Sequence, residues 1–263
     1  MIGQTIKLMD TSNAEFSAVS RVYGEQSRAT LAAAHVCVVG IGGLGSWVVE
    51  AIARSGIGNL TVIDPDDIAA SNINRQVHAD TSTVERAKVE VMQERVRLIN
   101  PECVCHAIDD MLVPRNIETY IGDHFDYVVD AMDSILFKAA LINYCKRNKI
   151  PIITIGGAGG RTDPSKIEIV DLSKTWNDAL AAKVRHRLRA KHGFRERKRF
   201  RVECVFSYEQ ARYPTGDGDI SYKKPGSKGV TLDCDTGYGS LVSVTASFGF
   251  MAAARGLNKL VAA

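Results

Sequence analysis

Four glycines, Gly40, Gly42, Gly43 and Gly45, stand between a short apolar run and a segment with helical spacing. Because glycine has no side chain, the backbone can come close to phosphate oxygens there. A helix that begins after the loop adds free N–H groups and a favourable dipole. The loop predicts a nucleotide-phosphate site, although a tight turn without a ligand is an alternative and NAD would fit as well as ATP.

Charged and polar residues further along the chain favour ATP. Asp64 ends the next apolar run, where a carboxylate can accept hydrogen bonds from ribose hydroxyls. Arg75 and Lys88 could neutralise the charge of a triphosphate, and Asp133 could hold Mg²⁺ through oxygen ligation. Hydride transfer needs none of these three groups. The alternative for Arg75 and Lys88 is an ordinary solvated helix face.

The elements that must position these residues alternate along the chain. Apolar runs predict strands at 36–39, 60–63, 104–108, 127–129 and 152–155. Helical spacing predicts helices at 46–54, 84–99 and 135–148. Such alternation is typical of an α/β fold, a Rossmann-like, mostly parallel sheet with helices on both faces.

The pattern changes after Gly156, where glycines, turns and a charged stretch replace the regular alternation. We expect an ATP-binding adenylation unit over 1–160 and a C-terminal, substrate-facing elaboration over 161–263 in the same fold unit. That second part would contain strands at 166–170 and 202–207 and a closing helix after Gly237. The apolar stretch 237–254 is rich in glycine, alanine and serine, so a buried helix is favoured over a membrane span.

The composition argues against a disulfide-stapled, a zinc-ribbon and a secreted protein. With 263 residues, 45% apolar and 24% charged, the chain can bury a sizeable core without disulfides. Its six cysteines lack the short paired spacing of a zinc ribbon or redox motif. The first 28 residues lack the uninterrupted apolar segment of a secretory signal, and we expect a cytoplasmic protein.

From Arg21 to Gly160 the combination of residues resembles the ubiquitin-activating-like adenylating enzymes of the ThiF and MoeB type. The resemblance implies ATP and Mg²⁺ as cofactors, and a homodimer in which Arg21 reaches the partner's site. It implies that the nucleotide is bound by Gly40, Gly42, Gly43, Gly45, Asp64, Asn72, Arg75 and Lys88. It further implies that Asp133 carries the metal and that Arg75, Lys88, Asp133 and Arg21 are catalytic.

Nearly from end to end the chain is similar to the tRNA threonylcarbamoyladenosine dehydratase branch of that family. The similarity lies in Asn148-Lys149-Ile150-Pro151, Gly156-Gly157-Ala158-Gly159-Gly160, Cys204-Val205-Phe206-Ser207, Asp233-Cys234 and Gly237-Tyr238-Gly239. It implies adenylation of the threonyl carboxylate at position 37 of tRNA, followed by ring closure with loss of water. Alternatives are an adenylyltransferase for a small sulfur-carrier protein, a nucleotide-binding module without turnover and a NAD-dependent dehydrogenase.

Two further features bear on this reaction. Between 183 and 201 the sequence has ten Lys and Arg against the single Glu196, which suits a tRNA backbone, although a solvated helix or loop is the alternative. The predicted contacts are Lys183, Arg185, Arg187, Arg189, Arg195, Arg197, Lys198 and Arg199.

Related enzymes often pass an acyl group to a cysteine, so Cys234 is a candidate for a thioester, with a buried, inert thiol as the alternative. A link to a cysteine desulfurase or other sulfur-acceptor system is a further expectation from some relatives.

Overall fold

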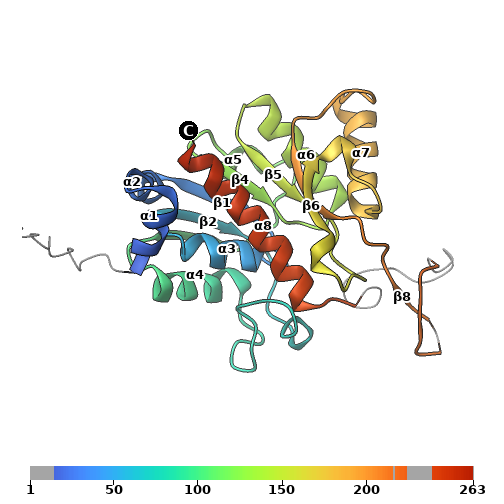
Figure 1. The fold of residues 1–263 in the computed structure, drawn as a ribbon, viewed down its shortest axis with the longest axis horizontal. Helices are drawn as coiled ribbons and strands as arrows, with labels where there is room; N and C mark the ends of the chain where they lie inside the picture. The colour runs from blue at the N-terminus through green and yellow to red at the C-terminus, as the bar shows by residue number, and fades with distance from the viewer. Residues whose placement is uncertain (1–14, 216, 224–238, 263) are drawn as a thin grey trace, which may run out of the picture.

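A seven-stranded sheet forms the centre of the molecule (Figure 1). The computed structural model describes residues 15–215, 217–223 and 239–262. Across the sheet the strands follow the order β3 (Val104–Ile108), β2 (Asn59–Ile63), β1 (His35–Val39), β4 (Tyr127–Asp130), β5 (Ile152–Ile155), β7 (Glu203–Ser207) and β6 (Ile167–Asp171). All pairs are parallel except β6 with β7, which confirms the predicted Rossmann-like fold. β6 and β7 continue the same sheet, and a separate ribbon pairs β8 (Tyr213–Pro214) with β9 (Ile220–Ser221).

Helices cover both faces of the sheet, because successive residues of each buried strand point to opposite sides. In β1, Val36 and Val38 belong to one core and Cys37 and Val39 to the other. The first core is closed by α3 (Gly45–Ala53), α4 (Lys88–Ile99) and α8 (Val242–Val261), and the second by α5 (Ile117–Tyr120), α6 (Ile135–Arg147) and α7 (Ala179–His192). Two N-terminal helices, α1 (Ser17–Tyr23) and α2 (Gln26–Ala33), lie beside the first group (Figure 1). Short 3₁₀ turns occur at Ala70–Asn72, Pro164–Lys166 and Leu172–Lys174.

The predicted helix over 84–99 begins later than its apolar spacing indicates. Glu85 has a positive φ of 70°, and its N–H donates to the Ile68 carbonyl. The Ile68 N–H in turn donates to the Arg86 carbonyl, so this segment pairs with the chain after β2. The helix therefore starts at Lys88, whose N–H donates to the carbonyl of Asp66.

The C-terminal helix α8 packs closely on α3. A side chain at Gly249 would lie 2.7 Å from the Leu44 carbonyl and from the Trp47 side chain, so only glycine permits this approach. Figure 1 shows α8 as the long red helix crossing the sheet. Among the helices in the described ranges, none combines the length and hydropathy that crossing a membrane requires.

Candidate active site

The glycine loop joins β1 to α3 and lies against the loop that follows β4. Gly40 has a φ of 82°, and a side chain there would meet the backbone of Ala131 and Met132 at 3.0 Å. At Gly45 a side chain would lie 1.8 Å from the Gly40 carbonyl oxygen. Both positions therefore require glycine. The loop leads directly into α3, so the free N–H groups of a helix N-terminus face the same place.

Beneath the loop, Asp64 and Lys88 form a buried ion pair. One carboxylate oxygen of Asp64 accepts from the Ile41 N–H at 2.7 Å, and the other accepts from the Asp66 N–H at 3.0 Å. The Lys88 ammonium lies 3.8 Å from Asp64 and 2.6 Å from Asp66. Burial raises the pKa of the Asp64 carboxyl, and Lys88 and the two backbone donors partly oppose this shift. Asp64 thus fixes the loop, and since a carboxylate has about four acceptor positions it can also accept from a ribose hydroxyl.

Arg75 and Asn72 lie on the segment that passes over the glycine loop. A side chain at Gly43 would come within 3.3 Å of the Arg75 side chain, which shows that Arg75 runs along the loop. Its guanidinium donates to the Ser71 carbonyl and to the Asn74 amide oxygen, at 2.7 and 3.0 Å, and forms no ion pair within the described residues. Asn72 is buried, and its amide oxygen accepts from the Ala69 N–H. The structure therefore brings Arg75 and Lys88 to the loop, and Asn72 precedes Arg75 on the same segment.

Asp133 is exposed and follows β4, three residues after the fully buried Asp130. Asp130 is held by the Lys138 ammonium at 3.1 Å and by the Thr154 hydroxyl at 2.6 Å. Lys138 is also buried, and it donates to the Met132 carbonyl at 2.8 Å. The pair thus fixes the backbone that carries Asp133 beside Gly40.

A second glycine pair lies at the end of β5. A side chain at Gly156 would lie 2.0 Å from an Asp178 carboxylate oxygen, and the Gly157 N–H donates to the same carboxylate at 2.9 Å. Asp178 also caps α7 by accepting from the Ala181 N–H. Arg161 adds bonds to the carbonyls of Gly157 and Asn177. These contacts anchor the start of α7 at the carboxyl edge of the sheet.

An aromatic pair follows on the same edge. Trp176, which is 46% exposed, stacks on Tyr208 with ring centroids 5.9 Å apart and an interplanar angle of 18°. Its ring also meets Phe206 edge to face at 4.8 Å. A planar apolar surface is therefore presented beside the end of β7.

Three of the predicted tRNA contacts are partly buried and five are exposed. Arg185 donates to the Thr175 hydroxyl, and burial, followed by the nearby Arg189, lowers the pKa of its guanidinium. Arg189 lies over the Phe200 ring at 5.4 Å. Arg187 is half-buried on α7. The exposed cations are Lys183, Arg195, Arg197, Lys198 and Arg199.

The structure places Arg21 away from the glycine loop. Arg21 is exposed on α1, whose neighbour Tyr23 donates to Asn258 near the end of α8, whereas α8 meets the loop region near Gly249. Nine helical residues separate these contacts, roughly 13 Å along the axis. Arg21 therefore lies away from the glycine loop of its own chain. Cys234 lies outside the described residues.

His78 is buried near Lys88, and neither of its ring nitrogens has a hydrogen-bond partner within the described part of the chain. Burial, followed by the charges of Lys88 and Arg95, lowers its pKa to about 4. The unfolded chain thus binds a proton on His78 at a higher pH than the folded chain, and the stability from the neutral ring is lost as the pH falls through this window.

We expect His78 to make folding sensitive to acid. Between pH 7 and pH 5 it should lower the free energy of unfolding by about 2 kcal/mol. Urea unfolding at both pH values should show that His78→Gln reduces this pH dependence. His186→Gln, at an exposed position of α7, should leave it unchanged. Equal pH dependence in all three proteins would contradict this assignment.

The residues that support the site are not among those predicted from the sequence. Lys138 gives no signal in the sequence, because a lysine in a helix is normally solvent-exposed. Asp178 directly precedes a helix, and this capping signal could have identified it. Trp176 carried no signal in the sequence, because its exposure depends on how the chain turns before α7.

Comparisons with known proteins agree with this geometry. A model of the ThiF family matches residues 16–262. The tRNA threonylcarbamoyladenosine dehydratase of Escherichia coli is 47% identical over 98% of this chain and 97% of its own length. The solved structure of the E. coli enzyme in complex with ATP has a TM-score of 0.84 at 45% identity and covers 96% of both chains. A molybdopterin-synthase adenylyltransferase of E. coli is 32% identical over 45% of this chain and 47% of its own. This chain belongs to the ThiF family.

Proposed function

We propose that this protein is an ATP-dependent tRNA threonylcarbamoyladenosine dehydratase. It adenylates the threonyl carboxylate of the modified adenosine at position 37 of tRNA and closes the side chain into a ring. The observation that carries the proposal is that the glycine loop, Arg75, Lys88 and Asp133 share one sheet edge with the start of the basic helix α7. The end-to-end similarity to dehydratases of that name supports the tRNA substrate.

The chemistry needs positioning and charge stabilisation more than acid or base groups. A carboxylate oxygen attacks the α-phosphorus of ATP, and pyrophosphate leaves. An internal nucleophile of the carbamoyl group then attacks the acyl carbon, AMP leaves and a proton is lost, so that the net change is loss of water. Lys88 and Arg75 stabilise the charge on the phosphates, and holding both reacting groups on one side chain accelerates the closure.

Mg²⁺ fits this arrangement through Asp133. The described residues contain no cluster of three or more His, Cys, Asp or Glu that could enclose a metal. Mg²⁺ is commonly held by one or two carboxylates together with substrate phosphates and water, and the exposed Asp133 carboxylate beside the loop offers such a contact. Bound there, the metal would neutralise phosphate charge.

Trp176 provides a surface for a base of the RNA. It lies beside the end of β7, two strand positions from β4 and thus roughly 10 Å from the Asp133 loop. Since unpaired RNA bases stack on aromatic rings, the base that bears or adjoins the reacting side chain can stack on Trp176.

Trp176→Ala is expected to lower kcat/KM for tRNA about 10-fold, since stacking on one base contributes about 1–3 kcal/mol. Trp176→Phe, which keeps an aromatic face, should retain most of this value. ATP affinity should be unchanged in both variants. Steady-state kinetics with each substrate varied separately provide the test, and a normal kcat/KM for Trp176→Ala would contradict the stacking role.

Several expectations accompany this proposal. A homodimer would bring Arg21 of one subunit to the loop of the other. A cytoplasmic location, a sulfur-system partner and a thioester at Cys234 stay predictions, as does the division at residue 160. Wild-type turnover by Cys234→Ala would exclude the covalent intermediate.

Substrate-dependent ATP–pyrophosphate exchange tests the proposed function. We expect exchange that depends on tRNA bearing threonylcarbamoyladenosine and on Mg²⁺. Exchange that instead depends on a small protein ending in Gly-Gly, without tRNA, would select the sulfur-carrier alternative.

Charge reversal at Arg197, Lys198 and Arg199 together should weaken tRNA binding and reduce the salt dependence of that binding. Unchanged tRNA affinity would exclude this segment as a tRNA contact.

A further inference from the structure

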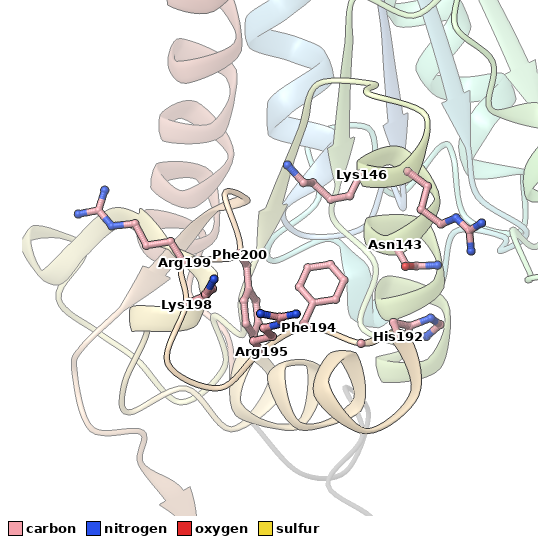
Figure 2. Close-up of a pocket in the computed structure, with 10 residues that line it drawn as sticks. Asn143, Lys146, His192, Phe194, Arg195, Lys198, Arg199 and Phe200 are labelled. Carbon is pink, nitrogen blue, oxygen red and sulfur yellow. The ribbon is translucent and has the colours of Figure 1, made fainter.

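A basic pocket lies at the far ends of α6 and α7 (Figure 2). It has a volume of about 330 Å³ and is formed by the last turns of α6 and the segment that follows α7. Figure 2 shows Lys146 and Asn143 on α6 across from Phe194 and Arg195. Phe194 packs edge to face on the buried Phe200 at 4.9 Å, which gives the pocket a rigid aromatic wall.

The charge of this pocket is not neutralised. Five of its lining residues are Lys or Arg, none is Asp or Glu, and the cations are Lys146, Arg147, Arg195, Lys198 and Arg199. None of the five forms a salt bridge within the described ranges. Lys146 donates to the Arg201 carbonyl at 3.3 Å, which places its ammonium beside the segment that follows α7. Five unpaired cations around one depression favour a phosphate group.

Two helices connect the pocket to the carboxyl edge of the sheet, where the glycine loop and Asp133 lie; this edge is called the catalytic edge. Ser134, directly after Asp133, caps α6, and Asp178, which holds Gly157, caps α7. Both helices end at the pocket, and α7 has 14 residues. At about 1.5 Å per residue the pocket lies roughly 20 Å from the catalytic edge. A stacked strand that rises about 3.4 Å per nucleotide covers this length in roughly six nucleotides.

We infer that the pocket binds a backbone phosphate of the tRNA on the order of six nucleotides away from the reacting adenosine. This inference rests on the proposed function. Lys146 and Arg147 come from α6, outside the basic segment 183–201, and complete the site from the opposite wall. The pocket thereby orients the stem of the RNA along α7 while its modified base lies at the catalytic edge.

The test compares two RNA lengths. Lys146→Ala combined with Arg147→Ala should raise the KM for full-length modified tRNA about 10-fold and reduce the salt slope of binding by about 0.7–0.9, the value for one phosphate contact. A modified trinucleotide is too short to reach the pocket, so its KM and that of ATP should not change. Arg97→Ala combined with Arg115→Ala removes the same charge at exposed positions elsewhere and should leave all three values as in the wild type.

Each other outcome has a distinct meaning. Equal loss with both RNAs, or equal loss in the control variant, would overturn the pocket's role. If the double variant lost affinity for inorganic phosphate or AMP alone while tRNA binding stayed normal, the ligand would be a free phosphate compound and the inference would be wrong. If the wild type did not turn over modified tRNA, the proposed function would be refuted. If the wild type did turn it over and the double variant had the same KM, only the role of the pocket would be refuted.

Discussion

Replacing Lys88 with methionine is expected to reduce tRNA-dependent pyrophosphate release about 10²–10³-fold. Lys88 is buried beneath the glycine loop, where it pairs with the buried Asp64 and the exposed Asp66, so water screens its charge less than that of a surface lysine. Removing a preorganised charge from such a site lowers the rate of the chemical step more than substrate binding. The measurement is kcat for pyrophosphate release with saturating ATP and modified tRNA.

Loss of Lys88 also leaves Asp64 buried without its cation, so a second variant must separate catalysis from folding. Arg75→Ala removes a charge beside the loop that has only local hydrogen bonds, and it should lower kcat while thermal unfolding stays close to wild type. Lys174→Met, at an exposed position, serves as the control for charge loss. Wild-type kcat in both Lys88→Met and Arg75→Ala would remove these residues from the mechanism.

The second large effect concerns stability, and it should follow Lys138→Met. The variant leaves the fully buried Asp130 carboxylate without its cation, which is expected to lower the free energy of unfolding by about 3–5 kcal/mol. Urea unfolding at neutral pH measures the loss. Because Lys138 also holds the Met132 carbonyl, adenylation should fall as the Asp133 loop shifts.

A compensating variant distinguishes an unpaired charge from lost packing. Adding Asp130→Asn to Lys138→Met removes the uncompensated carboxylate, so at least half of the lost stability should return. Lys174→Met should again resemble the wild type. If the double variant were as unstable as Lys138→Met alone, packing of the lysine stem and not charge would explain the loss.

The sequence predicted most of the fold because buried parallel strands are continuous apolar runs. The run at 36–39 and the strand His35–Val39 differ by one residue. The start of the helix at Lys88 was missed because apolar spacing cannot show that Ile68 pairs with the chain at Glu85 and Arg86. Tertiary hydrogen bonds decided that boundary.

The glycine loop, Asp64 and Asp133 could be placed together from the sequence because each closely follows a strand of the parallel sheet, and the carboxyl ends of parallel strands share one edge. The Asp130–Lys138 pair could not, because a buried charge depends on a partner that only the fold supplies. The same holds for the pocket, since Lys146 and the segment after α7 are far apart in sequence. Arg21 would reach a loop only through a second subunit.

Nucleoside mass spectrometry tests the central claim most directly. The protein would be incubated with ATP, Mg²⁺ and tRNA bearing threonylcarbamoyladenosine, and the digested nucleosides analysed against a reaction without ATP. We expect the modified nucleoside to lose one water, with one AMP formed for each conversion. An unchanged nucleoside in the presence of a protein that binds both ATP and tRNA would contradict the account.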